Sequence, residues 1–84
     1  MFHVRSPEDL GRALAELRRA AAQDQTDVAA RVGVERSYLA KLEGGHSSPL
    51  LDLIFDVLAE LDATLTVSRR GEDVVGRDKD IHGG

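Results

Sequence analysis

Residues 31–45 read RVGVERSYLAKLEGG, and from position 36 onward they carry two kinds of side chain in a helical repeat. Leu39 and Leu42 are three residues apart, so they share one face of a helix and would pack into a core. Arg36 and Lys41 then lie on the opposite face, where neither is needed to build a core. The segment therefore predicts a short amphipathic helix, about residues 36–43, whose exposed face is cationic.

A second short helix precedes this one and is separated from it by a glycine turn. Asp24 is a suitable N-cap for a helix over residues 25–32. Its buried stripe would be Val28, Ala29 and Val32. Gly33 follows, and glycine is the usual residue where a helix ends and the chain turns with positive φ. Two helices of about two turns joined in this way are the sequence pattern of a helix-turn-helix.

Longer helices are expected on both sides of this motif. Ser6-Pro7 supplies an N-cap and a first-turn proline, and apolar residues then recur at helical spacing to about Ala22. Ser48-Pro49 begins another helix, over residues 50–61. That last helix has only Asp52, Asp56 and Glu60 as a clearly polar stripe. A helix that is apolar so far round needs cover on two sides.

Residues 63–68, ATLTVS, alternate and are rich in β-branched side chains, which predicts a single strand. Residues 2–5 also alternate, but they are too few for us to expect them to be its partner. A strand with unpaired edges is a template for pairing with another chain. We therefore expect this strand to pair with the same segment of a second subunit.

The predicted fold is an all-α domain of four helices with a short C-terminal strand that pairs across a homodimer. We expect this domain to span residues 1–70. We expect residues 71–84, which are charged, contain glycine and are short of aromatic side chains, to form a disordered tail. The expected dimer interface consists of Leu53, Phe55, Val57, Leu61, Leu65 and Val67.

Composition limits the chemistry that is available. The 84 residues contain no cysteine, which excludes disulfides, thiolate metal sites and a cysteine nucleophile. The three histidines lack metal-ligand spacing, and His46 and Ser47 have no third catalytic group nearby. We therefore predict no enzyme activity, no metal and no cofactor. There is no pattern of a secretion signal or a membrane span, so we expect a cytoplasmic protein.

The net charge of −4 does not exclude nucleic acid, because it is spread unevenly. Residues 71–84 account for −2 of it, which leaves −2 for the other 70 residues, and one face can still be basic. Arginine can form two hydrogen bonds to guanine in the major groove, and lysine can bond guanine or a phosphate. Small Ala40, between Arg36 and Lys41, would allow close approach. This face is therefore predicted to enter a DNA groove.

Residues 25–54, QTDVAARVGVERSYLAKLEGGHSSPLLDLI, resemble the phage-repressor (Xre/Cro) helix-turn-helix family. The flanking segments RSPEDLGRALAELRRAA (5–21) and LAELDATLTVSRR (58–70) are similar to HipB-type antitoxins. This resemblance, over residues 4–70, implies a homodimer that represses its own operon at a palindromic operator and binds a HipA-like kinase toxin. A stand-alone Xre repressor shares most of these features. A protein-interaction module that does not bind DNA is a third interpretation.

The resemblance also implies roles for individual residues. It implies DNA contacts by Gln25, Thr26, Arg36, Ser37, Tyr38, Lys41, His46 and Ser47. Arg18 and Glu43 match a pair that the family uses as a buried ion pair between the first and third helices. Gln23 stands where the family usually has an apolar residue, and Ala22 where it often has glycine, so this corner is expected to differ. Glu35 would repel phosphates unless it accepts a hydrogen bond from cytosine.

Overall fold

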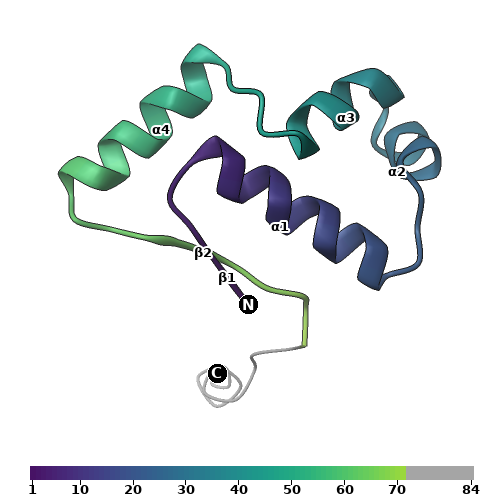
Figure 1. Cartoon of the computed structure of the whole chain (residues 1–84), viewed down its shortest axis with the longest axis horizontal. Helices are drawn as coiled ribbons and strands as arrows, with labels where there is room; N and C mark the ends of the chain where they lie inside the picture. The colour runs from purple at the N-terminus through teal and green to yellow at the C-terminus, as the bar shows by residue number, and fades with distance from the viewer. Residues whose placement is uncertain (72–84) are drawn as a thin grey trace, which may run out of the picture.

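A computed structural model describes residues 1–71 of the chain, and these form four helices and one two-stranded sheet. The elements are β1 (Phe2–Val4), α1 (Pro7–Ala20), α2 (Gln25–Val32), α3 (Arg36–Glu43), α4 (Pro49–Glu60) and β2 (Leu65–Val67). Figure 1 shows α1 in the middle, with α2 and α3 on one side of it and α4 on the other. The expected tail, apart from Gly71, lies outside the described residues.

Three of the four helices begin at the capping residues that the sequence indicates. The side chains of Ser6, Asp24 and Ser48 each accept a hydrogen bond from the backbone N–H three residues later, at 3.1, 2.9 and 3.3 Å. Each bond satisfies one of the N–H groups that a helix start leaves without a partner. α3 differs, because its N-cap residue, Glu35, makes no such side-chain bond.

A glycine allows α1 and α3 to cross with their backbones in contact. A Cβ atom placed on Gly11 would lie 2.5 Å from the carbonyl oxygen of Leu42 and 2.6 Å from that of Glu43. Both oxygens belong to the backbone of α3 and cannot move aside without moving the helix. Gly11 therefore sets how closely the third helix packs on the first.

The expectation that the C-terminal strand has no partner in its own chain is wrong. β2 pairs antiparallel with β1, in the register Phe2↔Val67, His3↔Thr66 and Val4↔Leu65. The short N-terminal segment pairs because it also buries apolar surface, and the Val4 side chain is only 1% exposed. The domain is thus mainly helical with a small antiparallel sheet within the chain, and not all-α.

The main core lies where this sheet meets α1 and α4. Val4, Ala13 and Phe55 are buried together. Phe2, Leu10, Leu51, Leu58 and Val67 pack around them. Two residues expected at a dimer interface, Phe55 and Val67, therefore belong to the chain's own core. Phe55 shares a helix face with Leu51 and Leu58, and that face is the one turned inward.

Smaller differences concern where elements end. α1 stops at Ala20, and Ala22 takes a left-handed backbone conformation, φ 57°. α4 begins and ends one residue earlier than expected, and β2 is limited to three residues. Val32, expected in the buried stripe of α2, is 69% exposed because it is the last residue of that helix and lies beside the Gly33 turn.

The left-handed Ala22 leads to a stability prediction. A non-glycine residue in this conformation costs about 1–2 kcal/mol, and glycine avoids the cost at the expense of greater freedom in the unfolded chain. Ala22→Gly should therefore raise the free energy of unfolding by about 1 kcal/mol, measured by urea denaturation. The matched control is Ala30→Gly, at an exposed position inside α2, which should lower that free energy. If Ala22→Gly and the original chain unfold at the same urea concentration, the strain at this corner is not significant.

Candidate nucleic-acid interface

The outward face of α3 carries the side chains that the sequence placed there. Arg36, Ser37 and Lys41 are exposed, and Tyr38 is 63% exposed. On the inward face Leu39 and Leu42 are half-buried. Ala40 is also half-buried, so it lies at the margin of the exposed face and not at its centre. The first turn of α3 thus presents a cation, a hydroxyl and a phenol to solvent.

Gln25, the first residue of α2, connects the two ends of α3. Its Nε2 donates to Oε1 of Glu43 at 2.9 Å, and its Oε1 accepts a hydrogen bond from Nη1 of Arg36 at 3.0 Å. The Arg36 guanidinium is therefore held beside the start of α2. An amide has two N–H donors, so Gln25 keeps one for an external acceptor.

A largely buried ion pair links α1 to the last residue of α3. Nε of Arg18 donates to Oε2 of Glu43 at 2.7 Å, and Nη2 donates to Oε1 at 3.0 Å. The Arg18 side chain is 15% exposed and that of Glu43 is 6% exposed. Paired hydrogen bonds of this kind fix the relative orientation of the two groups. Arg18 also donates to the backbone carbonyl of Gln23 at 2.9 Å, which ties the α1–α2 corner to the same pair.

The two charges shift each other's titration. Hydrogen bonding from Arg18 lowers the pKa of Glu43, with a smaller contribution from Gln25, and burial opposes the shift. Hydrogen bonding to Glu43 raises the pKa of Arg18. Glu43 therefore stays ionised and neutralises Arg18, so neither charge acts on a ligand at the α3 surface at full strength.

The α1–α2 corner contains a cation that the sequence did not single out. The guanidinium of Arg31, in the last turn of α2, donates to the side-chain carbonyl of Gln23. Gln23 is exposed, so a polar side chain is tolerated there, and Arg31 supplies its hydrogen-bond donor. Thr26, expected to contact DNA, is exposed in the first turn of α2. In the sequence, the only signal for this contact is the position of Arg31 near the end of α2.

The loop between α3 and α4 brings several of the expected residues together. A hollow of about 110 Å³ is lined by Tyr38, Lys41, Leu42, His46, Ser47, Ser48 and Leu51. Ser47 Oγ donates to Oδ1 of Asp52 at 2.6 Å. The sequence analysis places Asp52 only in the polar stripe of its helix. In the structure, Asp52 accepts the hydrogen bond of the Ser47 hydroxyl, which was expected to lie near the DNA backbone.

Two further findings concern residues 1–71 alone. They contain no group of three or more histidine, aspartate and glutamate side chains arranged to hold a metal ion. In the same part of the chain, each helix is too short or too polar to cross a membrane.

Comparison with known protein families gives a match to the greater part of the chain. A family model described as a helix-turn-helix domain matches residues 9–73, which include all of α2, α3, α4 and β2 but not β1. Neither the curated proteins nor the solved structures contain a match to the chain.

The pKa shift of Glu43 predicts a pH-dependent contribution to stability. The pKa of Glu43 in the folded protein lies below the ordinary value of 4.5. Its contribution to the free energy of unfolding is therefore complete above pH 4.5, and it is lost as the pH falls through the lowered pKa. Glu43→Gln should lower the free energy of unfolding by about 2 kcal/mol at pH 7. In acid, where Glu43 of the original chain is protonated, the unfolding temperatures of the variant and the original chain should converge. Thermal unfolding between pH 7 and 3 measures this. Glu16→Gln, at an exposed site on α1, is the control. A difference that does not change with pH would contradict the prediction.

Proposed function

Because the chain belongs to the helix-turn-helix domain family, we propose that it is a sequence-specific DNA-binding transcriptional repressor that inserts α3 into the major groove. The observation that carries this proposal is the exposed face of α3, where Arg36 is held in place by Gln25. An arginine whose guanidinium is already positioned loses less side-chain entropy when it binds a base.

The contacts available fall into two kinds. Arg36 and Ser37, in the first turn of α3, are suited to base edges, because the N-terminal residues of a recognition helix enter the groove first. The remaining N–H of Gln25, and Lys41 one turn later, are suited to phosphates. The ion pair helps this arrangement, since Arg18 cancels a carboxylate of α3 that would otherwise repel DNA.

A symmetric dimer is the second part of the proposal. Leu50, Leu53, Ile54, Val57 and Leu61 are 41–69% exposed along α4, although all are large apolar residues. Such a patch on a small domain is typical of a protein interface. If a two-fold axis buries it against a second copy, two α3 helices can meet successive major grooves about 34 Å apart, which requires a palindromic operator. The edge of β2 that does not face β1 is available to pair with its copy.

The finer biological role that we propose is that of an antitoxin. Its support is the resemblance of residues 5–21 and 58–70 to HipB-type proteins, which implies a HipA-like kinase toxin as partner. Co-expression with the adjacent reading frames, followed by a pull-down, tests this role. A stable kinase-like partner would support it, whereas its absence would favour a stand-alone Xre repressor.

The DNA-binding proposal predicts distinct effects for two cations. Arg36→Ala should cost about 1–3 kcal/mol on the operator and relax discrimination at one base pair. Lys41→Ala should weaken binding to all sequences and reduce the salt slope by about one ion. Fluorescence anisotropy with the protein's own promoter, over a range of salt, measures both.

Arg12→Ala is the control for these variants, because Arg12 is an exposed cation on α1 that bonds Asp9 at 2.6 Å. It should leave affinity unchanged. If the original chain shows no salt-dependent binding to its promoter, the protein-interaction interpretation replaces this one.

The dimer is best tested on α4 by point substitution. Deleting residues 63–84 would remove β2 from the chain's own core, so that deletion cannot separate dimerisation from folding. Leu53→Glu and Val57→Glu change side chains that are 57% and 46% exposed, so each should leave thermal stability of the monomer nearly unchanged. Both should shift sedimentation toward monomer and weaken operator binding. Asp56→Asn, on the polar stripe, is the control. A full-strength dimer in both glutamate variants would show that α4 is not the interface.

A further inference from the structure

Glu35 is the N-cap residue of α3, and its backbone is extended, with φ −76° and ψ 146°. The caps of the other helices, Ser6, Asp24 and Ser48, each accept a backbone N–H bond through the side chain, whereas Glu35 does not. Short polar side chains are the preferred N-caps, and glutamate is not one of them. The stability of α3 therefore does not explain a carboxylate at this position.

The carboxylate of Glu35 is free within the domain. The residue is exposed, and among residues 1–71 its side chain has no hydrogen-bond or ion-pair partner. The carboxylate at the other end of α3 differs, because Glu43 pairs with Arg18. Of the two acidic side chains at the ends of α3, one is thus neutralised inside the domain and the other is left for an external donor.

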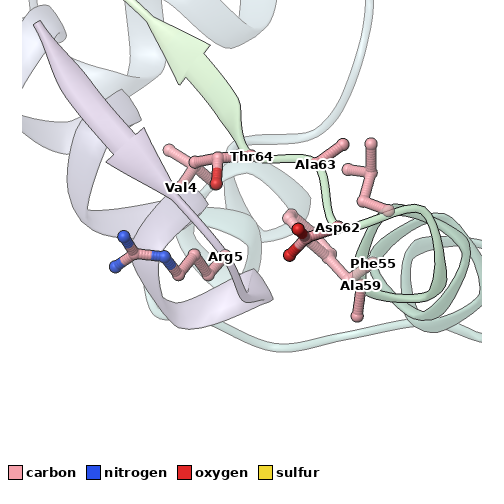
Figure 2. A pocket seen from close by; sticks show the side chains of 8 residues that line it. Val4, Arg5, Phe55, Ala59, Asp62, Ala63 and Thr64 are labelled. Atoms are coloured by element: carbon pink, nitrogen blue, oxygen red, sulfur yellow. The ribbon is translucent and has the colours of Figure 1, made fainter.

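A carboxylate beside a helix end does not by itself indicate a contact with DNA. Asp62, just after α4, lines a cavity of about 260 Å³ together with Val4 and Phe55 (Figure 2). That cavity lies at the C-terminal end of α4, away from α3 (Figure 1). Glu35 differs in its neighbour, since the next residue is Arg36, which Gln25 holds at the start of α3 by a hydrogen bond of 3.0 Å.

The start of α3 thus presents an acceptor beside a donor. In the major groove, guanine shows the acceptors N7 and O6, thymine shows the acceptor O4, and adenine shows its N6 amine beside the acceptor N7. Each of these acceptors would repel a carboxylate. Cytosine shows the N4 amine as its hydrogen-bonding group, so its edge is the one that suits glutamate. A carboxylate that enters the groove without such a donor loses its water and gains nothing in return.

We propose that Glu35 determines specificity by accepting a hydrogen bond from N4 of a cytosine, while Arg36 binds a guanine on the same or an adjacent base pair. Successive Cα atoms are about 3.8 Å apart, close to the rise of about 3.4 Å between base pairs, so two neighbouring residues suit neighbouring bases. The inference rests on the insertion of α3 into the major groove in the proposed function, and it does not depend on the dimer.

The alternative is that Glu35 only repels phosphates, and the two hypotheses differ in what they change. Repulsion lowers affinity for every sequence by a similar factor, since each sequence has the same phosphates. A base contact instead changes the preference at one position. Discrimination between bases therefore separates the hypotheses where affinity alone does not.

The experiment is selection from a randomised double-stranded DNA library by the full chain, followed by fluorescence anisotropy with the selected duplex and its single-base variants. The selected motif should contain a cytosine within one base pair of the guanine whose selection Arg36→Ala relaxes. Glu35→Gln should move the preference at that cytosine toward adenine, because an amide can bond both N6 and N7 of adenine.

Glu35→Ser separates recognition from folding. Serine is a preferred N-cap, so this variant should unfold at a higher temperature than the original chain. It should nevertheless lose about tenfold or more of the discrimination at the cytosine. The matched control is Asp27→Asn, which removes a charge from an exposed side chain in the first turn of α2 and should change no base preference.

The outcomes distinguish the inference from the proposal beneath it. If the original chain selects no motif, DNA binding by α3 is wrong and the inference falls with it. If a motif is selected and Arg36→Ala relaxes one position, but both Glu35 variants keep every base preference or only raise affinity for all sequences, Glu35 merely repels DNA. A change of preference at a base other than cytosine would equally overturn the inference while leaving the proposed function in place.

Discussion

The buried pair of Arg18 and Glu43 is the interaction on which the proposed DNA-binding surface depends. It joins the end of α1 to the end of α3 by two hydrogen bonds. The close approach at Gly11 brings the two backbones together earlier along α1. Two separated points of contact fix both the position and the direction of a helix. Because α3 has only eight residues and no side-chain cap, it gains its stability from these contacts rather than from its own propensity.

The same pair helps an acidic chain to present a cationic face. Between residues 47 and 68 the sequence has four carboxylates and no basic residue. Residues 31–46 have Arg31, Arg36 and Lys41 against Glu35 and Glu43, and Glu43 is paired with Arg18. Since α1 stands between α3 and α4, the carboxylates of the later turns of α4 lie on the other side of the domain from α3 (Figure 1), whereas Asp52 lies at the α3–α4 loop, where it accepts a hydrogen bond from Ser47. Charges separated by more than about 10 Å are largely screened at ordinary salt concentrations, so the net charge says little about the groove-facing surface.

Local rules were sufficient for the helices and insufficient for the sheet. Caps such as Ser6 and Ser48 act within four residues, and the sequence therefore places helix starts to within a residue. The pairing of Phe2 with Val67 joins opposite ends of the domain through three-residue strands, and no local pattern distinguishes it from pairing between subunits.

The assignment of Phe55 to the dimer interface failed for the same reason. Helical spacing shows that α4 has two apolar sides, but only the unforeseen β1 determines which side faces inward. The sequence motif also does not predict the two hydrogen bonds of the Gln25 side chain, because they depend on where Arg36 and Glu43 lie in the folded domain.

The small sheet has a mechanical consequence for recognition. β1 leads directly into α1 through the Ser6 cap, and β2 follows directly from α4, so the β1–β2 ladder joins the proposed dimer elements to the helix that holds α3. In the proposed dimer, a contact made at β2 and α4 would therefore be transmitted through β1 and α1 to Gly11 and the Arg18–Glu43 pair. In such a dimer, the spacing of the two α3 helices would be set by this chain of contacts, while their base preference would be set by Arg36 and its neighbours. Spacing and preference would then be separable properties, since the first depends on packed backbone far from DNA and the second on a few exposed side chains.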